Sequence, residues 1–297
     1  MKSPIRRVLI LGHTGFIGTH LTRQVAADHA GLEVVGRAPV ALDLTHEQSR
    51  GSLYELFDPG TAVLMLAAVK RQFGDNVDAF SRNIAMVMNL CRLLQERPIG
   101  RLIYFSSAAV YGEETHDLHI TEETCVNPMS YYGTAKFAGE CLFRQLIRAR
   151  PDVSLLCIRP PLVYGAGDRG ETYGPSGFIR SVIRGKPITL WGDGTELREF
   201  VYVEDIARIV SQLVSSDHQG VLNVASGSSY SFRTALDVLE RLSPGPLEVS
   251  SRPRTKKSVD NGFDNERLRT LLPAHHFTPL EEGMRKAFLA ERQALQA

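Results

Sequence analysis

The sequence lacks long apolar runs and shows no targeting segment. Its longest apolar run, from Thr61 to Val69, is far shorter than the roughly 20 residues that a helix needs to cross a bilayer. No signal-peptide hydrophobic region precedes the first apolar segment. We therefore expect a cytoplasmic protein with no membrane partner.

The sequence also lacks an excess of charge and any closely spaced pair of cysteines. Its 34 lysines and arginines nearly balance 33 aspartates and glutamates, so the formal net charge is only +1. Such a balance offers no basic field for nucleic acid, which is therefore not an expected partner. The scattered cysteines argue against a zinc site and against a disulfide framework, so we expect reduced thiols and no bound metal. They are Cys91, Cys125, Cys141 and Cys157.

The N-terminal half contains a regular alternation of short apolar runs with helical patterns. The runs are nearly continuous in apolar residues, as in strands of a parallel sheet that is covered by helices on both faces. They occupy residues 7–11, 32–35, 62–66, 102–105 and 154–158. Helical spacing follows the first run, and further helical stretches cover residues 80–96 and 132–149. This alternation predicts a doubly wound α/β domain of the Rossmann type.

The composition of the sequence changes after residue 160. Glycine and proline become frequent between residues 165 and 194. We expect a cofactor-binding Rossmann domain at residues 1–160 and a smaller α/β substrate-binding lobe at residues 161–297. The run GVLNVA at residues 220–225 predicts one more strand, which we expect to join the main sheet.

A glycine-rich turn lies between the first expected strand and the first expected helix. Glycine permits a tight turn and a close approach of the backbone to a pyrophosphate, and the following helix offers unpaired N–H groups. An ordinary tight turn is the alternative, but this position favours dinucleotide binding. The candidate cofactor-binding residues here are Gly12, Gly15, Phe16, Ile17 and Gly18.

The second expected strand ends at Arg37, where NAD-binding proteins usually have an acidic residue for the ribose 2′-OH. A guanidinium can instead pair with a 2′-phosphate, so Arg37 favours NADPH, with NAD still possible. A solvated surface arginine is the alternative. Asp43 and Leu44 follow soon after, and they either reach the adenine edge or form a simple turn.

Three polar residues in the right order form a candidate catalytic unit. Tyr132 and Lys136 are four residues apart and so lie on one face of a helix. The ammonium would lower the phenol pKa from about 10 toward neutrality, so that Tyr132 exchanges a proton with a sugar hydroxyl or ketone. Lys136 could also hold the nicotinamide ribose. Ser107 follows a strand at the carboxyl edge of the sheet, where it could position the reacting oxygen. Taken singly, the three could be a core aromatic, a solvated charge and a helix cap.

Nearly the whole chain resembles the extended short-chain dehydrogenase/reductase family, in particular the NAD-dependent epimerase/dehydratase branch that acts on nucleotide sugars. The motifs are GHTGFIG (12–18), LAA (66–68), SSAAVYG (106–112), YGTAK (132–136), RPPLVYG (159–165), WGDGTELREFVYVEDIA (191–207) and NVASG (223–227). The resemblance implies that Ala67 and Ala68 line the cofactor and that Arg198 contacts the diphosphate of the substrate. An ion pair of Arg198 with a neighbouring glutamate, Glu196 or Glu199, is the alternative. A second nucleotide-binding arginine is also implied, and we assign it to Arg252.

The chain departs from this resemblance at several positions. Related 4,6-dehydratases have an acidic pair where this chain has Ala108 and Ala109, so water elimination would lack its acid and base. Related 3,5-epimerase/reductases that make GDP-fucose have a cysteine where Ala109 stands, so epimerisation by that route is not expected. Leu162 replaces a common substrate-binding asparagine and Met65 a frequent histidine, so we expect unusual substrate placement.

The remaining chemistry needs only hydride transfer and the proton of Tyr132. We expect NADPH-dependent reduction of a nucleotide-linked 4-keto-6-deoxyhexose, because Arg37 favours NADPH. A 4-epimerase with retained NAD uses the same residues and stays open. A non-catalytic scaffold is a further alternative, which the intact Ser107, Tyr132 and Lys136 argue against. The resemblance also implies a homodimer in which the helices near residues 80–96 and 132–149 form a four-helix bundle.

Overall fold

The computed structural model describes residues 3–37, 42–114, 116–170, 174–254 and 258–296. The first two residues of the expected Rossmann domain, 1–2, and the last residue of the expected second lobe, 297, lie outside the described residues. The chain divides into two compact units. The first unit comprises residues 1–113, 125–160 and 207–222, and the second comprises residues 114–124, 161–206 and 223–297. Each unit is thus built from separate stretches of the chain.

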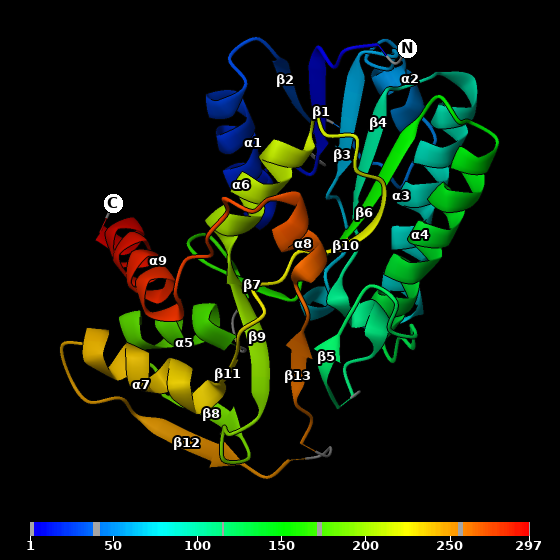
Figure 1. Ribbon diagram of the computed structural model, residues 1–297. Helices are drawn as coiled ribbons and strands as arrows, with labels where there is room; N and C mark the ends of the chain where they lie inside the picture. The colour runs from blue at the N-terminus through cyan, green and yellow to red at the C-terminus, as the bar shows by residue number, and fades with distance from the viewer. Residues whose placement is uncertain (1–2, 38–41, 115, 171–173, 255–257, 297) are drawn as a thin grey trace. The chain divides into compact units, whose positions relative to one another are not determined.

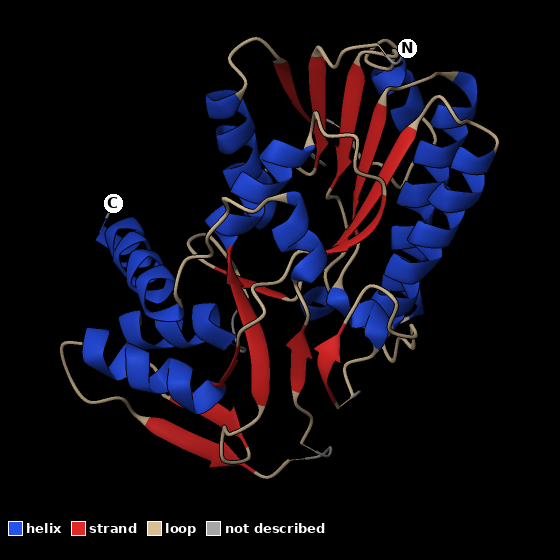
Figure 2. Cartoon of the chain, in the orientation of Figure 1, coloured by secondary structure: helices blue, strands red, loops and turns tan. Residues whose placement is uncertain are grey.

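A six-stranded sheet forms the centre of the first unit (Figures 1 and 2). Its strand order is β10-β6-β4-β3-β1-β2, and the pairs among β2, β1, β3, β4 and β6 are parallel. The strands are β1 (Arg7–Leu11), β2 (Glu33–Arg37), β3 (Thr61–Met65), β4 (Arg101–Phe105), β6 (Ser154–Arg159) and β10 (Gly220–Asn223). Every residue of β3, β4 and β6 is buried, because helices cover both faces of the sheet. The predicted Rossmann-type α/β architecture is confirmed.

Helices flank this sheet in pairs. On one face α3 (Val77–Glu96) and α4 (Tyr131–Arg148) lie side by side (Figure 1). On the other face lie α1 (Phe16–Asp28) and α6 (Val203–Leu213), joined by a hydrogen bond of 2.7 Å from Ser211 Oγ to Asp28. The shorter elements of this unit are α2 (Ser49–Tyr54) and the 3₁₀ turns η1 (Arg71–Phe73) and η2 (Ala108–Tyr111).

The second unit contains three small sheets and a group of helices. Its sheets have the orders β11-β9-β7, β12-β8 and β13-β5. The strands are β5 (Asp117–Ile120), β7 (Leu162–Tyr164), β8 (Ile188–Trp191), β9 (Leu197–Tyr202), β11 (Ser229–Ser231), β12 (Val249–Arg252) and β13 (Asn261–Phe263). The helices are α5 (Gly174–Ile183), α7 (Phe232–Leu242), α8 (Glu266–Leu271) and α9 (Leu280–Gln296).

An aromatic cluster and one distant strand pair hold the second unit together. Phe232 contacts both Phe178 and Phe200, with ring centroids 6.1 and 5.5 Å apart. β5 belongs to this unit because it pairs with β13, far along the chain. None of the described helices in either unit is long and apolar enough to span a membrane.

Candidate active site

The glycine-rich turn between β1 and α1 is packed too tightly for side chains. A Cβ on Gly18 would lie 2.1 Å from the Gly12 carbonyl oxygen, and one on Gly12 would lie 2.9 Å from the Ala67 amide. Gly12 also has a φ of +95°, a conformation that favours glycine. Its amide donates to the Arg37 carbonyl at 2.9 Å. The turn, the end of β2 and the segment after β3 therefore meet at one edge of the sheet.

This edge fits a dinucleotide. β1 lies between β2 and β3, so the chain leaves it in opposite directions, and open α/β sheets bind ligands at such a switch point. α1 begins at Phe16 after the N-cap Gly15, which offers no capping side chain. The first amides of α1, Phe16 and Ile17 among them, thus present the positive end of the helix dipole to a pyrophosphate. Ala67 donates its amide to Leu11, and the following Ala68 is half-buried.

The residues expected around the adenosine differ in what they contact. The Arg37 side chain is half-buried, and its Nη1 donates to the Gly36 carbonyl at 2.9 Å. The Asp43 carboxylate accepts hydrogen bonds from the Thr45 amide and hydroxyl, at 2.9 and 2.7 Å, and these bonds lower its pKa. Leu44 packs in the hydrophobic core. In this structure Asp43 binds the backbone and side chain of Thr45, two residues further along the chain.

The structure brings Ser107, Tyr132 and Lys136 together in the first unit. Ser107 precedes η2, and its side chain hydrogen-bonds to that of Tyr132. Tyr132 lies in the first turn of α4, which Ser130 caps by accepting from Gly133 at 3.0 Å. One helical turn later, Lys136 Nζ lies 5.7 Å from the Tyr132 ring centroid. The three side chains therefore lie close to one another at the start of α4.

The pKa values of this group differ from the expectation, which had lysine lowering the phenol pKa toward neutrality. Burial raises the pKa of Tyr132 to about 12, although the Ser107 hydrogen bond opposes the rise. Burial also lowers the pKa of Lys136 to about 7, against the attraction of Glu140. Burial is the first cause of both shifts, with the Lys136 side chain buried and that of Tyr132 half-buried.

The sequence did not lead us to predict a buried ion pair between Glu140 and Arg159, which lies next to this group. Arg159, at the end of β6, donates from Nε and Nη2 to the two oxygens of Glu140, at 2.8 and 2.6 Å. Ser106 also donates to Glu140, at 2.5 Å. The signal was available, because Glu140 follows Lys136 by one helical turn and Arg159 is a cation in an apolar strand. Lys136 itself donates to the Phe105 carbonyl at 2.7 Å.

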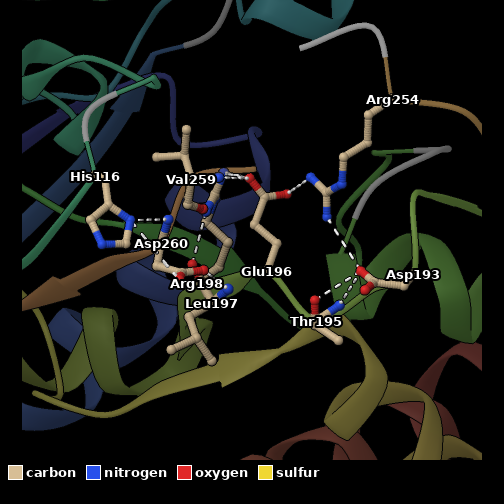
Figure 3. A network of polar contacts seen from close by, with 9 residues as sticks. All are labelled: His116, Asp193, Thr195, Glu196, Leu197, Arg198, Arg254, Val259 and Asp260. Carbon is tan, nitrogen blue, oxygen red and sulfur yellow. Dashed lines mark hydrogen bonds and ion pairs between the residues drawn. The ribbon is translucent and has the colours of Figure 1, made fainter. Parts of the chain in front are cut away.

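In the second unit Arg198 is engaged by Glu196 (Figure 3). Arg198 Nη2 lies 2.5 Å from Glu196 Oε1, and its Nη1 donates to the carbonyls of Leu197 and Val259. The alternative of an ion pair with Glu196 is therefore realised in this structure. Glu199 is buried and accepts from the Ser226 and Gly227 amides instead, and burial raises its pKa to about 7.

Arg254, rather than Arg252, joins Arg198 in this cluster. Arg254 Nη1 donates to the second Glu196 oxygen at 2.8 Å (Figure 3). Arg252 is exposed at the end of β12, and its carbonyl accepts from the Gly192 amide at 2.8 Å. β12 ends at Arg252, and Arg254 lies two residues beyond this end, where its guanidinium binds Glu196.

Comparison with known proteins identifies the group to which this chain belongs. The model of the NAD dependent epimerase/dehydratase family matches residues 8–225. The chain belongs to this family. It is therefore an enzyme of the short-chain dehydrogenase/reductase type, as the resemblance implied.

The relatives of this family member include both reductases and epimerases. A GDP-6-deoxy-D-mannose reductase of Pseudomonas aeruginosa is 29% identical, over 86% of each chain. An uncharacterized UDP-glucose epimerase, YtcB, of Bacillus subtilis is 23% identical, over 94% of this chain and 95% of its own. The solved structure of MoeE5 in complex with UDP-glucuronic acid and NAD has a TM-score of 0.85 and 25% identity, and the match covers 97% of this chain and 99% of MoeE5.

Proposed function

We propose that this family member is an NADPH-dependent reductase of a nucleotide-linked 4-keto-6-deoxyhexose. The observation that carries the proposal is the hydrogen bond between the Ser107 and Tyr132 side chains, with Lys136 one helical turn further along α4. A nicotinamide bound along the glycine-rich turn would supply the hydride. The family relatives include a reductase of a GDP-linked 6-deoxysugar, which supports this reaction class.

Each polar residue has a separate role in this proposal. Ser107 holds the carbonyl oxygen of the substrate in line with Tyr132, which donates its proton to that oxygen. Lys136 holds the nicotinamide ribose, and Arg198 pairs with the substrate diphosphate. Ala108 and Ala109 supply no acid or base next to Ser107, so the site carries out proton and hydride transfer without water elimination.

Arg37 supports NADPH as the cofactor. It ends β2, and its carbonyl accepts from Gly12, so it lies beside the turn where the adenosine ribose of a dinucleotide would bind. A guanidinium there pairs with a 2′-phosphate, whereas no acidic residue ends β2 to hold a free 2′-OH. Arg37→Ser should therefore lower NADPH affinity about tenfold and leave NADH affinity within about twofold.

The test is incubation of the purified protein with NADPH or NADH and with 4-keto-6-deoxyhexoses linked to GDP, dTDP, CDP or UDP. We expect one nucleotide series to consume NADPH stoichiometrically, measured by nicotinamide absorbance. Consumption of neither cofactor with any series would reject the reductase. UDP-sugars would then be tested for epimerisation without net change of cofactor, because one family relative is named a UDP-glucose epimerase.

We also propose that the protein forms a homodimer through α3 and α4. Both helices keep half-buried apolar side chains, among them Ile84 and Met88 of α3 and Phe137 and Leu142 of α4. Such residues remain partly exposed after the helices pack on the sheet, and a second copy would cover them. Light scattering should give about twice the chain mass of 32.9 kDa. A monomer mass at micromolar concentration would reject the dimer.

A further inference from the structure

Glu196 is the centre of a charged network at the start of β9 (Figure 3). One carboxylate oxygen contacts Arg198 and accepts from the Val259 amide at 3.0 Å. The other accepts from Arg254 at 2.8 Å. A single carboxylate thus binds two guanidinium groups that come from separate segments of the chain.

Two cationic and two anionic side chains make up this network, and three of the four are largely shielded from water. The side chains of Glu196, Arg198 and Arg254 are 11%, 13% and 20% exposed, so water screens them only in part. Asp193 contributes a second negative charge at 3.9 Å from Arg254, and its own side chain is largely exposed. Although burial opposes ionisation, both arginines and the Val259 amide hold the pKa of Glu196 below its ordinary value. The carboxylate therefore stays charged, as two nearby cations require.

We propose that Glu196 is an internal competitor of the anionic ligand and thereby sets the affinity for the nucleotide sugar. Its carboxylate occupies the guanidinium groups that a diphosphate would use, and it must release at least one of them when the diphosphate binds. This inference rests on the proposed nucleotide-sugar substrate and on the role of Arg198 in binding it.

Two physical reasons make Glu196 a competitor instead of a simple support. A diphosphate and a carboxylate that share two guanidinium groups repel each other, so binding of one weakens binding of the other. Glu196 also precedes β9, in the loop that follows β8, where its side chain can swing away without breaking a strand pairing. Displacement of the Glu196 carboxylate would break the hydrogen bond that it accepts from the Val259 amide.

The network contains a matched control. Asp260 accepts from the Leu197 amide at 2.8 Å and its other oxygen lies 4.0 Å from His116 (Figure 3). It thus carries the same charge at the same end of β9 but is bound to an amide and a histidine. Asp260→Asn therefore removes one negative charge without releasing a guanidinium.

The experiment measures nucleoside diphosphate binding by calorimetry, with UDP, GDP, dTDP and CDP as probes. Glu196→Gln should bind the preferred nucleoside diphosphate about five- to tenfold more tightly than the unmodified protein. Asp260→Asn should bind it within about twofold, and both variants should bind NADPH unchanged. Equal or weaker binding by Glu196→Gln would overturn the competitor role. If the unmodified protein binds none of the four probes, the proposed nucleotide-sugar substrate fails instead.

A second measurement uses the unmodified protein and so does not depend on folding of the variant. Amide hydrogen exchange reports the bond from Val259 to Glu196 and the bond from Leu197 to Asp260 separately. Saturation with the preferred nucleoside diphosphate should speed exchange at Val259 and leave Leu197 unchanged. Unchanged or slower exchange at Val259 would show that the carboxylate keeps its place and would overturn the proposal.

Discussion

Each unit contains a glutamate held between cations, but the two are built differently. Glu140 in the first unit is fully buried, and Arg159 binds both of its oxygens from the end of a central strand. Glu196 in the second unit stands in a loop and divides its oxygens between Arg198 and Arg254. Helix and strand fix both partners of the first pair, whereas the loop leaves Glu196 able to move.

This difference separates a permanent ion pair from an exchangeable one. Losing one partner of a fully buried pair leaves a charge that water cannot reach, which is strongly destabilising. Arg198 and Arg254 keep some contact with water, so another anion can replace Glu196 at a smaller cost. The first unit thus suits the positioning of a reacting group, and the second suits the binding of an anion.

The largest expected effect tests whether the first unit carries turnover. Tyr132→Phe should lower kcat about 10²- to 10⁴-fold, because the proton donor is lost while binding contacts remain. Tyr131→Phe is the control, since Tyr131 is the exposed neighbour on α4. Steady-state NADPH consumption measures kcat, and calorimetry should show nucleoside diphosphate binding unchanged. Equal kcat values for the Tyr132→Phe and Tyr131→Phe variants would show that Tyr132 of the first unit does not carry turnover.

The next effect compares the two glutamates directly. Glu140→Gln should lower the free energy of unfolding by about 3–5 kcal/mol, because it leaves Arg159 buried without a countercharge. Glu196→Gln should lower it by about 1 kcal/mol or less, since its arginines remain near water. Urea denaturation of both variants measures the difference. Similar losses would mean that the two ion pairs do not differ as described.

A pH effect of intermediate size tests the dry surroundings of Lys136. Burial lowers its folded-state pKa to about 7, below the ordinary 10.5, so between these values the unfolded chain binds more protons. The contribution of Lys136 to stability therefore rises as the pH rises from 7 to 9. Relative to Lys136→Met, the unmodified protein should gain on the order of 1–3 kcal/mol over this interval. Parallel stability curves in urea would show that Lys136 is not desolvated.

The smallest effect distinguishes the arginines of the second unit. Arg198→Gln should weaken nucleoside diphosphate binding about tenfold, because it removes a charge-assisted contact. Arg252→Gln should stay within about twofold, since the exposed Arg252 stands apart from the Glu196 network. Calorimetry with the preferred nucleoside diphosphate compares the two. A larger loss for Arg252→Gln would support the assignment of Arg252 to nucleotide binding.

The central sheet and the catalytic order could be predicted because each depends on short-range pattern. Strands buried on both faces must be continuously apolar, so β1, β3, β4 and β6 were found to within one residue at each end. Helical spacing likewise brought Tyr132 and Lys136 to one face. The pairing of β5 with β13 could not be foreseen, because it joins short, partly polar segments that are far apart in the sequence.

The amino-acid sequence by itself determined the family, the Rossmann-type sheet and the order of the candidate residues, because periodicity and motif spacing are local properties of the chain. Only the tertiary structure decided the charge state and the partner of those residues. Burial raises the pKa of Tyr132, and Arg254 rather than Arg252 binds Glu196. Both outcomes depend on which distant atoms exclude water or approach a charge, and this is a property of packing.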